Sequence, residues 1–132
     1  MFEWRNDKLI NAHFNNFNVT RCRAITSLNF RIEYNKFYEQ TPIIILDIAY
    51  GEEELEKIIK MEFYGVDALK VNTGFFPYIQ VMGFEINNIK DTGSEKKYEI
   101  NDYEDGVLYF VCDAVRVVAI NDVVDEMINF DR

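Results

Sequence analysis

The stretch that decides the fold runs from Lys97 to Ile120. It reads Lys97-Tyr98-Glu99-Ile100-Asn101-Asp102-Tyr103, then Glu104-Asp105-Gly106, then Val107-Leu108-Tyr109-Phe110-Val111-Cys112-Asp113-Ala114-Val115-Arg116-Val117-Val118-Ala119-Ile120. Alternating apolar residues on both sides of an Asp-Gly turn are the strongest short-range signal of a β-hairpin. The residues after the turn continue as further strand. The stretch therefore predicts a β protein in which neighbouring strands pair.

Two changes of register along the chain predict bent strands. Between Ile79 and Ile86 the apolar residues move from odd to even positions at Met82-Gly83, and after Cys112 they move from even to odd at Asp113-Ala114. A shift of one residue turns every following side chain to the opposite face, so a bulge or a bend must absorb it. Such bends are typical of a closed roll, or of a strand that is shared between two sheets.

Two strands are expected upstream. Leu28 to Tyr34 alternates strictly between apolar and polar residues, which predicts a half-buried antiparallel strand. Asn35 to Pro42 is expected to be a loop. Ile43 to Tyr50 is apolar on both faces apart from Asp47, so we expect it to be a central strand.

The segment Glu52 to Phe63 fits both helical and strand spacing. We favour a loop over its first residues and a strand that ends near Tyr64, followed by a short strand at Leu69 to Val71. The total is about seven or eight strands. The prediction is therefore an all-β, single-domain antiparallel sandwich or roll over residues 1–132.

Both ends of the chain differ from this pattern. Residues 1–20 are rich in asparagine, with aromatic residues at intervals, and predict an irregular N-terminal arm pinned to the core by those aromatics. A short helix around Asp7 to Phe14 is the alternative there. Residues 121–132 show helical spacing of apolar residues, and Asn121 or Asp122 is a suitable N-cap, so a short C-terminal helix is expected.

Composition narrows the class of partner. The chain has 132 residues, 48% of them hydrophobic, and a net charge of −9. An acidic protein repels nucleic acids and anionic lipids and attracts basic proteins, so we expect no nucleic-acid or membrane partner. The longest aliphatic run, Ile43 to Leu46, is too short to span a bilayer, and no apolar export signal is present at the start. We expect a cytoplasmic protein.

The sequence offers no catalytic set. His13 is the single histidine and lies among asparagines, a poor setting for a rigid general base. Cys22 and Cys112 match no metal or redox spacing, and Cys112 is expected to be a small buried hydrophobic residue. Carboxylates cluster in turns, where water solvates them, and no calcium-loop or phosphate-loop motif appears. We therefore expect a protein that is not an enzyme, with no cofactor and no metal.

Two segments are candidates for contact with a partner. The aromatic residues Phe75, Phe76 and Tyr78 either close the open end of a sheet or form an exposed apolar contact site. The acidic turn that contains Asp102, Glu104 and Asp105 is a solvated hairpin end, and it becomes a partner site only where the partner is basic.

The second half resembles small bacterial immunity proteins of polymorphic toxin systems, in particular the all-β group known as immunity protein 50. The matching residues are Ile59-x-Met61-x-Phe63-x-Gly65-Val66, Ile86-x-x-Ile89 and Tyr98-x-Ile100-x-Asp102-Tyr103-x-x-Gly106-x-Leu108-x-Phe110-x-Cys112-x-x-Val115-x-Val117. The resemblance covers about residues 20–120. It implies a cytoplasmic bacterial protein that binds and blocks a cognate toxin, and it implies no catalytic residue.

The leading hypothesis is thus a non-catalytic protein-binding module that neutralises a basic toxin. Two alternatives remain open. One is a small-ligand-binding β protein whose pocket is lined by aromatic residues around 75–78 and 103–110. The other is a structural subunit of a homo-oligomer.

Overall fold

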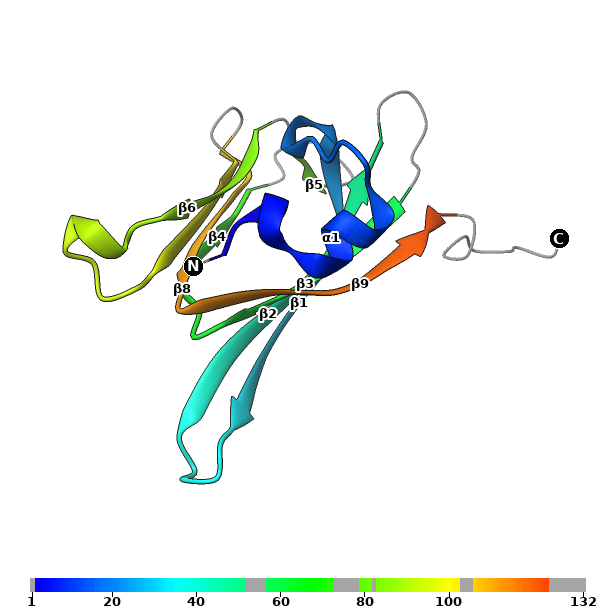
Figure 1. Ribbon diagram of the computed structural model, residues 1–132. Helices are drawn as coiled ribbons and strands as arrows, with labels where there is room; N and C mark the ends of the chain where they lie inside the picture. The colour runs from blue at the N-terminus through cyan, green and yellow to red at the C-terminus, as the bar shows by residue number, and fades with distance from the viewer. Residues whose placement is uncertain (1, 52–56, 73–78, 82, 103–105, 124–132) are drawn as a thin grey trace, which may run out of the picture.

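The computed structural model describes residues 2–51, 57–72, 79–81, 83–102 and 106–123. Within these residues nine strands form two antiparallel sheets, which face each other across a common core (Figure 1). The prediction of an all-β fold is confirmed, and the strand count is slightly higher than expected.

The first sheet has the strand order β5-β1-β2-β3-β9. Its strands are β1 (Cys22–Tyr34), β2 (Gln40–Tyr50), β3 (Lys57–Tyr64), β5 (Ile79–Gln80) and β9 (Ala114–Asp122). The second sheet has the order β4-β8-β7-β6. Its strands are β4 (Asp67–Val71), β6 (Phe84–Asn88), β7 (Tyr98–Asp102) and β8 (Leu108–Cys112). The predicted hairpin is the pair β7–β8, and its turn residues 103–105 lie outside the described residues.

The core lies between the two sheets. The central strand β2 contributes Ile44, Leu46 and Ile48, all fully buried. Phe63 of β3 meets Phe110 of β8 edge to face, with ring centroids 5.0 Å apart, and this contact joins the two sheets. The prediction that Ile43 to Tyr50 is a central strand is confirmed, because β1 and β3 flank it.

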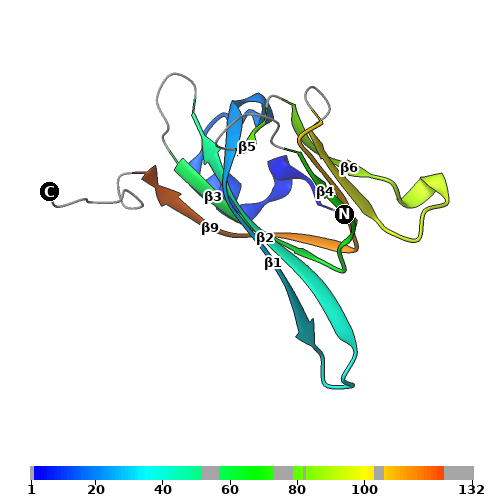
Figure 2. The same ribbon diagram turned by 180° about the vertical axis from the view of Figure 1, so that it is seen from behind.

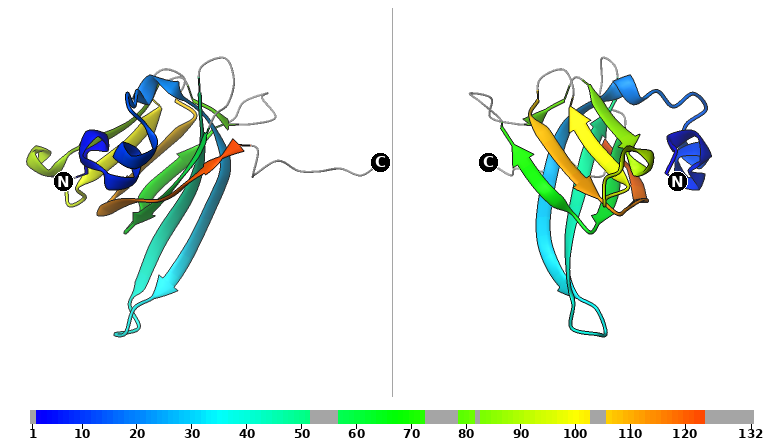
Figure 3. Two further views of the ribbon diagram at one scale, coloured as in Figure 1. Left: turned by 45° about the vertical axis from the view of Figure 1, so that its right-hand side comes forward. Right: turned by 90° about the vertical axis from the view of Figure 1, so that its left-hand side faces the viewer.

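At one corner of the molecule the chain changes sheet twice. Gly65 and Val66 separate β3 from β4, and Asp113 alone separates β8 from β9. The two changes of sheet lie side by side, because the Asp113 N–H donates to the Tyr64 carbonyl oxygen at 2.8 Å. The register change predicted at Asp113-Ala114 is therefore the point where the chain passes from β8 in the second sheet to β9 in the first (Figure 3).

The predicted strand from Ile79 to Ile86 is not one strand. It divides into β5, which pairs with β1 in the first sheet, and β6, which pairs with β7 in the second. The division falls at Met82-Gly83, where the change of register was predicted, and Met82 itself lies outside the described residues. The bend is held by the buried Gly83 N–H, which donates to a carboxylate oxygen of Asp102 at 3.0 Å.

The N-terminal segment closes one side of the space between the sheets (Figure 1). Helix α1 (Lys8–His13) is the predicted short helix, capped by Asp7, whose Oδ1 accepts from the Ile10 N–H at 3.0 Å. Ile10 is fully buried, and Trp4 stacks on Phe17 with centroids 4.9 Å apart. The aromatic anchoring is confirmed, but the segment is less irregular than expected because η1 (Trp4–Asn6) and η2 (Val19–Arg21) are helical turns.

One smaller prediction needs correction. The loop between β1 and β2 ends at Glu39 and not at Pro42, which is the third residue of β2. Strand β9 continues through Asn121 and Asp122, and Val123, the last described residue, is helical. The rest of the expected C-terminal helix falls on residues 124–132, which lie outside the described residues. One further helical turn, η3 (Lys90–Thr92), lies between β6 and β7. No helix within the described ranges has the length and apolar character that crossing a bilayer requires.

Candidate protein-interaction surface

The hairpin β1–β2 extends beyond the rest of the first sheet as a two-stranded arm, residues 29–41 (Figures 1 and 2). Residues 29–40 are all exposed. On the side of β2, the ladder to β3 begins only at Ile43, which pairs with Tyr64. On the side of β1, the ladder to β5 covers only Ala24 and Ile25. The arm therefore lacks a neighbouring strand on either edge within the described part of the chain.

One face of the arm is apolar. Phe30, Ile32 and Tyr34 of β1 lie on the same face as Leu28, and they are 48%, 46% and 64% exposed. Across the ladder, Phe30 pairs with Ile44 and Ile32 with Pro42. Paired residues share a face of the sheet, so this apolar face is the continuation of the inner face that forms the core.

The burial predicted for Leu28 to Tyr34 is therefore wrong for most of its length. The strand and its alternation are present, and Leu28 packs against the core. The residues beyond it extend past the edge of the second sheet, so no layer covers them (Figure 3). Alternation indicates which side chains share a face, but it does not show whether another element covers that face.

The tip of the arm carries two more exposed aromatic residues. Phe37 and Tyr38 are 68% and 88% exposed. Asn35 shapes the turn, because its side-chain oxygen accepts from the N–H groups of Phe37 at 2.8 Å and of Glu39 at 3.1 Å. Tyr38 has φ +62°, in the left-handed region that glycine or asparagine usually occupies. Tyr38 thus combines a strained backbone with a side chain that makes little contact.

Exposed large hydrophobic residues are concentrated on the arm. Five of the six in the described part of the chain lie there, and Val71 of β4 is the sixth. Scattered exposed apolar residues are ordinary in proteins, whereas a contiguous set is typical of a contact surface.

The residues predicted to contact a partner lie elsewhere. Asp102 is completely buried at the end of β7, where it holds the Gly83 N–H, so it is a structural residue and not part of a solvated acidic turn. Phe75, Phe76, Tyr78, Glu104 and Asp105 all lie outside the described residues. The sequence did contain a sign of the arm: two aromatic residues, Phe37 and Tyr38, in a segment expected to be a polar loop.

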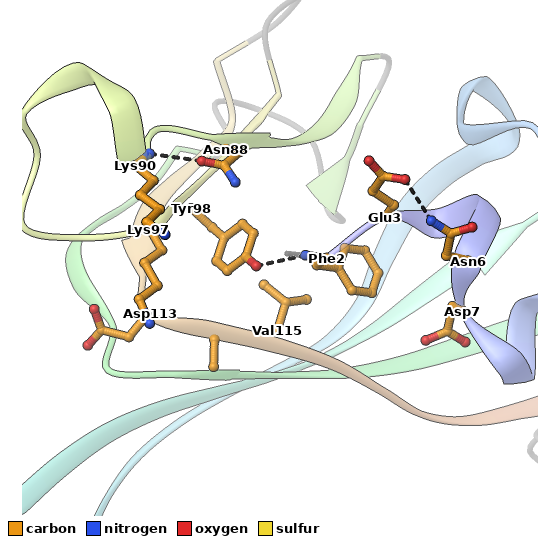
Figure 4. Close-up of a pocket in the computed structure, with 11 residues that line it drawn as sticks. Phe2, Glu3, Asn6, Asp7, Asn88, Lys90, Lys97, Tyr98, Asp113 and Val115 are labelled. Carbon is orange, nitrogen blue, oxygen red and sulfur yellow. Dashed lines mark hydrogen bonds between the residues drawn. The ribbon is translucent and has the colours of Figure 1, made fainter.

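A partly open cleft of about 520 Å³ lies between the N-terminal segment, η3 with its flanking residues and the start of β9 (Figure 4). Its lining is of mixed charge, with Glu3 and Asp7 on the N-terminal side and Lys90, Lys97 and Asp113 on the other. The Phe2 N–H donates to the Tyr98 hydroxyl oxygen at 2.7 Å across the cleft. Phe2 and Tyr98 are the aromatic residues that line it, and the described residues 106–110, expected around a ligand pocket, do not line it. Residues 75–78 lie outside the described residues.

The buried thiols are not nucleophiles at neutral pH. Burial raises the pKa of Cys22 to about 12. Burial, together with the charge of neighbouring Asp113, raises the pKa of Cys112 to about 12. Both cysteines are free and buried, which confirms the expectation for Cys112. His13 is exposed on α1, with Nδ1 3.0 Å from the Leu9 carbonyl oxygen.

Among the described residues, no group of three or more histidine, cysteine and carboxylate side chains is placed to hold a metal ion. The arm has the clearest features of an interaction surface, because its exposed apolar residues are contiguous.

No protein-family model matches the chain, and no curated protein and no solved structure matches it either.

Proposed function

We propose that this protein is a non-catalytic binding module that holds a partner protein on the apolar face of the arm. The observation that carries the proposal is the contiguous exposure of Phe30, Ile32 and Tyr34, with Phe37 and Tyr38 at the tip. Tyrosine and phenylalanine are enriched at protein interfaces, where they bury a large area at small entropic cost.

The partner that best fits the chain as a whole is a basic protein. The net charge of −9 favours encounter with a positively charged surface, while the apolar arm supplies contact area. The resemblance of the second half to immunity proteins supports the finer proposal that this partner is a bacterial toxin, which the protein neutralises by binding in the cytoplasm.

The proposal is tested by co-expression with any toxin gene that adjoins this gene in its native genome. Wild-type protein should restore growth of cells that produce the toxin, and the purified pair should form a complex that weakens as salt is raised. Ile32→Lys places a charge in the centre of the apolar face and should abolish both rescue and complex formation. Absence of rescue by the wild-type protein would refute toxin neutralisation.

A matched control separates binding from folding. Val71 is 43% exposed, close to the 46% of Ile32, but it lies on β4 in the second sheet. Val71→Lys should therefore retain rescue and complex formation. Both variants should unfold close to the wild-type temperature and by a similar margin, because the two positions are about equally exposed. Equal loss of binding in the two variants would show that the arm is not the contact surface.

The cleft of Figure 4 supports a second candidate function, the binding of a small ligand. Its volume of about 520 Å³ lies in the range typical of ligand sites. The cleft is lined by carboxylates and by lysines, and this combination suits a zwitterion such as a free amino acid. A panel of amino acids that leaves the melting temperature unchanged at millimolar concentration would eliminate this candidate.

A further inference from the structure

We propose that a second copy of this chain pairs with the open edge of β1, antiparallel and centred on Ile32. The result is a four-stranded sheet across two molecules, in the order β2-β1-β1-β2. This inference goes beyond the proposed function and rests on the strand edge of the arm, not on its apolar face.

The edge of β1 presents backbone groups that need partners. Asn35 N–H donates to the Glu39 carbonyl at 3.1 Å, so the backbone of Asn35 bonds toward β2. Hydrogen-bonded positions alternate in an antiparallel ladder, and the ladder of β1 and β2 is regular from Ser27 to Tyr34. The N–H and C=O groups of Phe30, Ile32 and Tyr34 therefore point away from β2.

Proline supports this assignment of directions. Pro42 pairs with Ile32 and has no N–H group. Proline is tolerated at this position because the residue there makes no hydrogen bond to β1. Its carbonyl oxygen instead accepts from the N–H groups of Gly65 at 2.9 Å and Val66 at 3.1 Å, on the side away from β1. Among the described residues, the outward groups of Ile32 and its neighbours pair with no strand, so this edge of the sheet is a template for a further strand.

Charge on β1 selects one register for the pairing of two identical strands. A two-fold axis at Ile32 places Arg31 of each copy opposite Glu33 of the other. The two charges lie on the same face of β1 and already form an ion pair, with Nη2 and Oε1 3.0 Å apart. Two oppositely charged cross-strand pairs then stabilise the dimer.

Neighbouring registers are electrostatically worse. An axis at Arg31 would place the two arginines opposite each other, and an axis at Glu33 would do the same with the two glutamates. An axis between residues would set outward backbone groups against inward ones and break the ladder. The register centred on Ile32 also pairs Phe30 of each copy with Tyr34 of the other.

Pairing at the edge leaves the apolar face uncovered and widens it. The inner faces of both arms become one surface, to which each copy contributes Phe30, Ile32 and Tyr34. The dimer is therefore compatible with a partner protein on that face. It predicts that a captured partner is bound by two copies of this chain.

The central test is charge reversal followed by sedimentation across a concentration series of two orders of magnitude. Wild-type protein should be a dimer at the upper concentrations. Arg31→Glu or Glu33→Arg turns both cross-strand pairs into like-charge pairs and should weaken dimerisation by about tenfold or more. The double variant, with both reversals in one chain, should restore the dimer.

Mixing gives the sharpest control. The Arg31→Glu chain carries two glutamates on this face of β1, and the Glu33→Arg chain carries two arginines. Each should be monomeric alone, and together they should form a one-to-one heterodimer. General loss of folding cannot produce that pattern.

A cysteine cross-link tests the register directly. Ile32→Cys places two thiols across the axis, with Cα atoms about 5.5 Å apart, within the range of a disulfide. It should form a covalent dimer under mild oxidation. Asn29→Cys is the matched control, because its two copies would lie roughly 20 Å apart along the strand. Cys22 and Cys112 are buried and do not interfere.

Three results would overturn the dimer: a wild-type monomer throughout the series, a dimer that ignores charge reversal, or equal cross-linking of the two cysteine variants. The first would assign Arg31 and Glu33 to protection of an exposed edge instead. A monomer that still binds and neutralises the toxin would refute this inference alone, whereas a dimer that binds no toxin would refute the proposed function alone.

Discussion

The two halves of the hairpin β1–β2 share one continuous apolar face, which is buried in the body of the protein and exposed in the arm. In the body of the protein, Leu46 and Ile48 of β2 are fully buried beneath the second sheet. In the arm, Phe30, Ile32 and Tyr34 continue the same face and are about half exposed or more. The difference arises from the length of the neighbouring elements, because the second sheet ends before the hairpin does (Figure 3).

The comparison teaches that an apolar face can serve two purposes on one strand pair. Where the second sheet covers it, the face stabilises the fold, since burial of apolar surface drives folding. Where nothing in the described chain covers it, the face adds little stability and remains available for contact. Substitutions on the two halves should therefore differ strongly in their effect on the free energy of unfolding.

The largest expected effect is the loss of an aromatic contact between the sheets. Phe63→Ala removes the fully buried ring that packs against Phe110, and it should lower the free energy of unfolding by about 3–5 kcal/mol. Ile32→Ala on the arm should lower it by less than about 1 kcal/mol. Urea denaturation measures both values, and equal losses would show that the arm face is covered in solution.

The second effect concerns the corner where the chain changes sheet. Gly65 has φ +70°, and a Cβ added there would lie 2.2 Å from Asp113 Oδ2, an oxygen held by Lys96 at 3.1 Å. Gly65→Ala should cost about 2–3 kcal/mol, through backbone strain and the clash together.

Gly93 provides the control for this corner. Its φ is +85°, but nothing lies within 4 Å of an added Cβ. Gly93→Ala should therefore cost only the backbone strain, about 1 kcal/mol. Thermal unfolding of the two variants is the measurement, and similar losses of stability would contradict the close approach of Gly65 to Asp113.

The third effect tests the structural role assigned to Asp102. Asp102→Ala leaves the buried Gly83 N–H without its acceptor and should cost about 1–2 kcal/mol. Asp102→Asn keeps an acceptor oxygen, so it should remain within about 1 kcal/mol of wild type. Chemical denaturation distinguishes the two. Wild-type stability of the alanine variant, with loss of partner binding, would instead return Asp102 to the predicted contact site.

The smallest effect lies at the tip of the arm. Tyr38 has φ +62° and is 88% exposed, so Tyr38→Gly relieves strain and removes few contacts. Glycine also makes the unfolded chain more flexible, so the net gain in the free energy of unfolding should be at most about 0.5 kcal/mol. Binding of the partner should weaken in the same variant. A clear loss of stability would mean that the Tyr38 side chain packs against the protein.

The elements that were predicted well are those whose sequence signals come from neighbouring residues. The β7–β8 hairpin follows from its Asp-Gly turn, and the change of sheet at Asp113 from the change of register in the sequence. Helix α1, which the sequence offered only as the alternative to an irregular arm, is capped by Asp7. The division of β5 from β6 was only partly foreseen, because a change of register does not show which sheet each half joins.

The candidate site was poorly predicted for a different reason. Asp102 was expected to be solvated with the other acids of the turn, because acidic residues in turns usually are. Instead the chain brings the Gly83 N–H against its carboxylate. The arm was expected to be half covered because its alternation is that of a covered strand. Both errors concern contacts between segments distant in sequence, which no local pattern contains.

The sequence by itself determined the all-β class, most strand positions and the two places where strands bend, because alternation, turn residues and register are properties of neighbouring residues. The tertiary structure alone decided which apolar face is covered, that Asp102 is internal, and that no strand of the described chain pairs with the outer edge of β1 in the arm. Burial and edge exposure depend on the relative lengths of elements that meet in space, so they arise only once the two sheets are assembled.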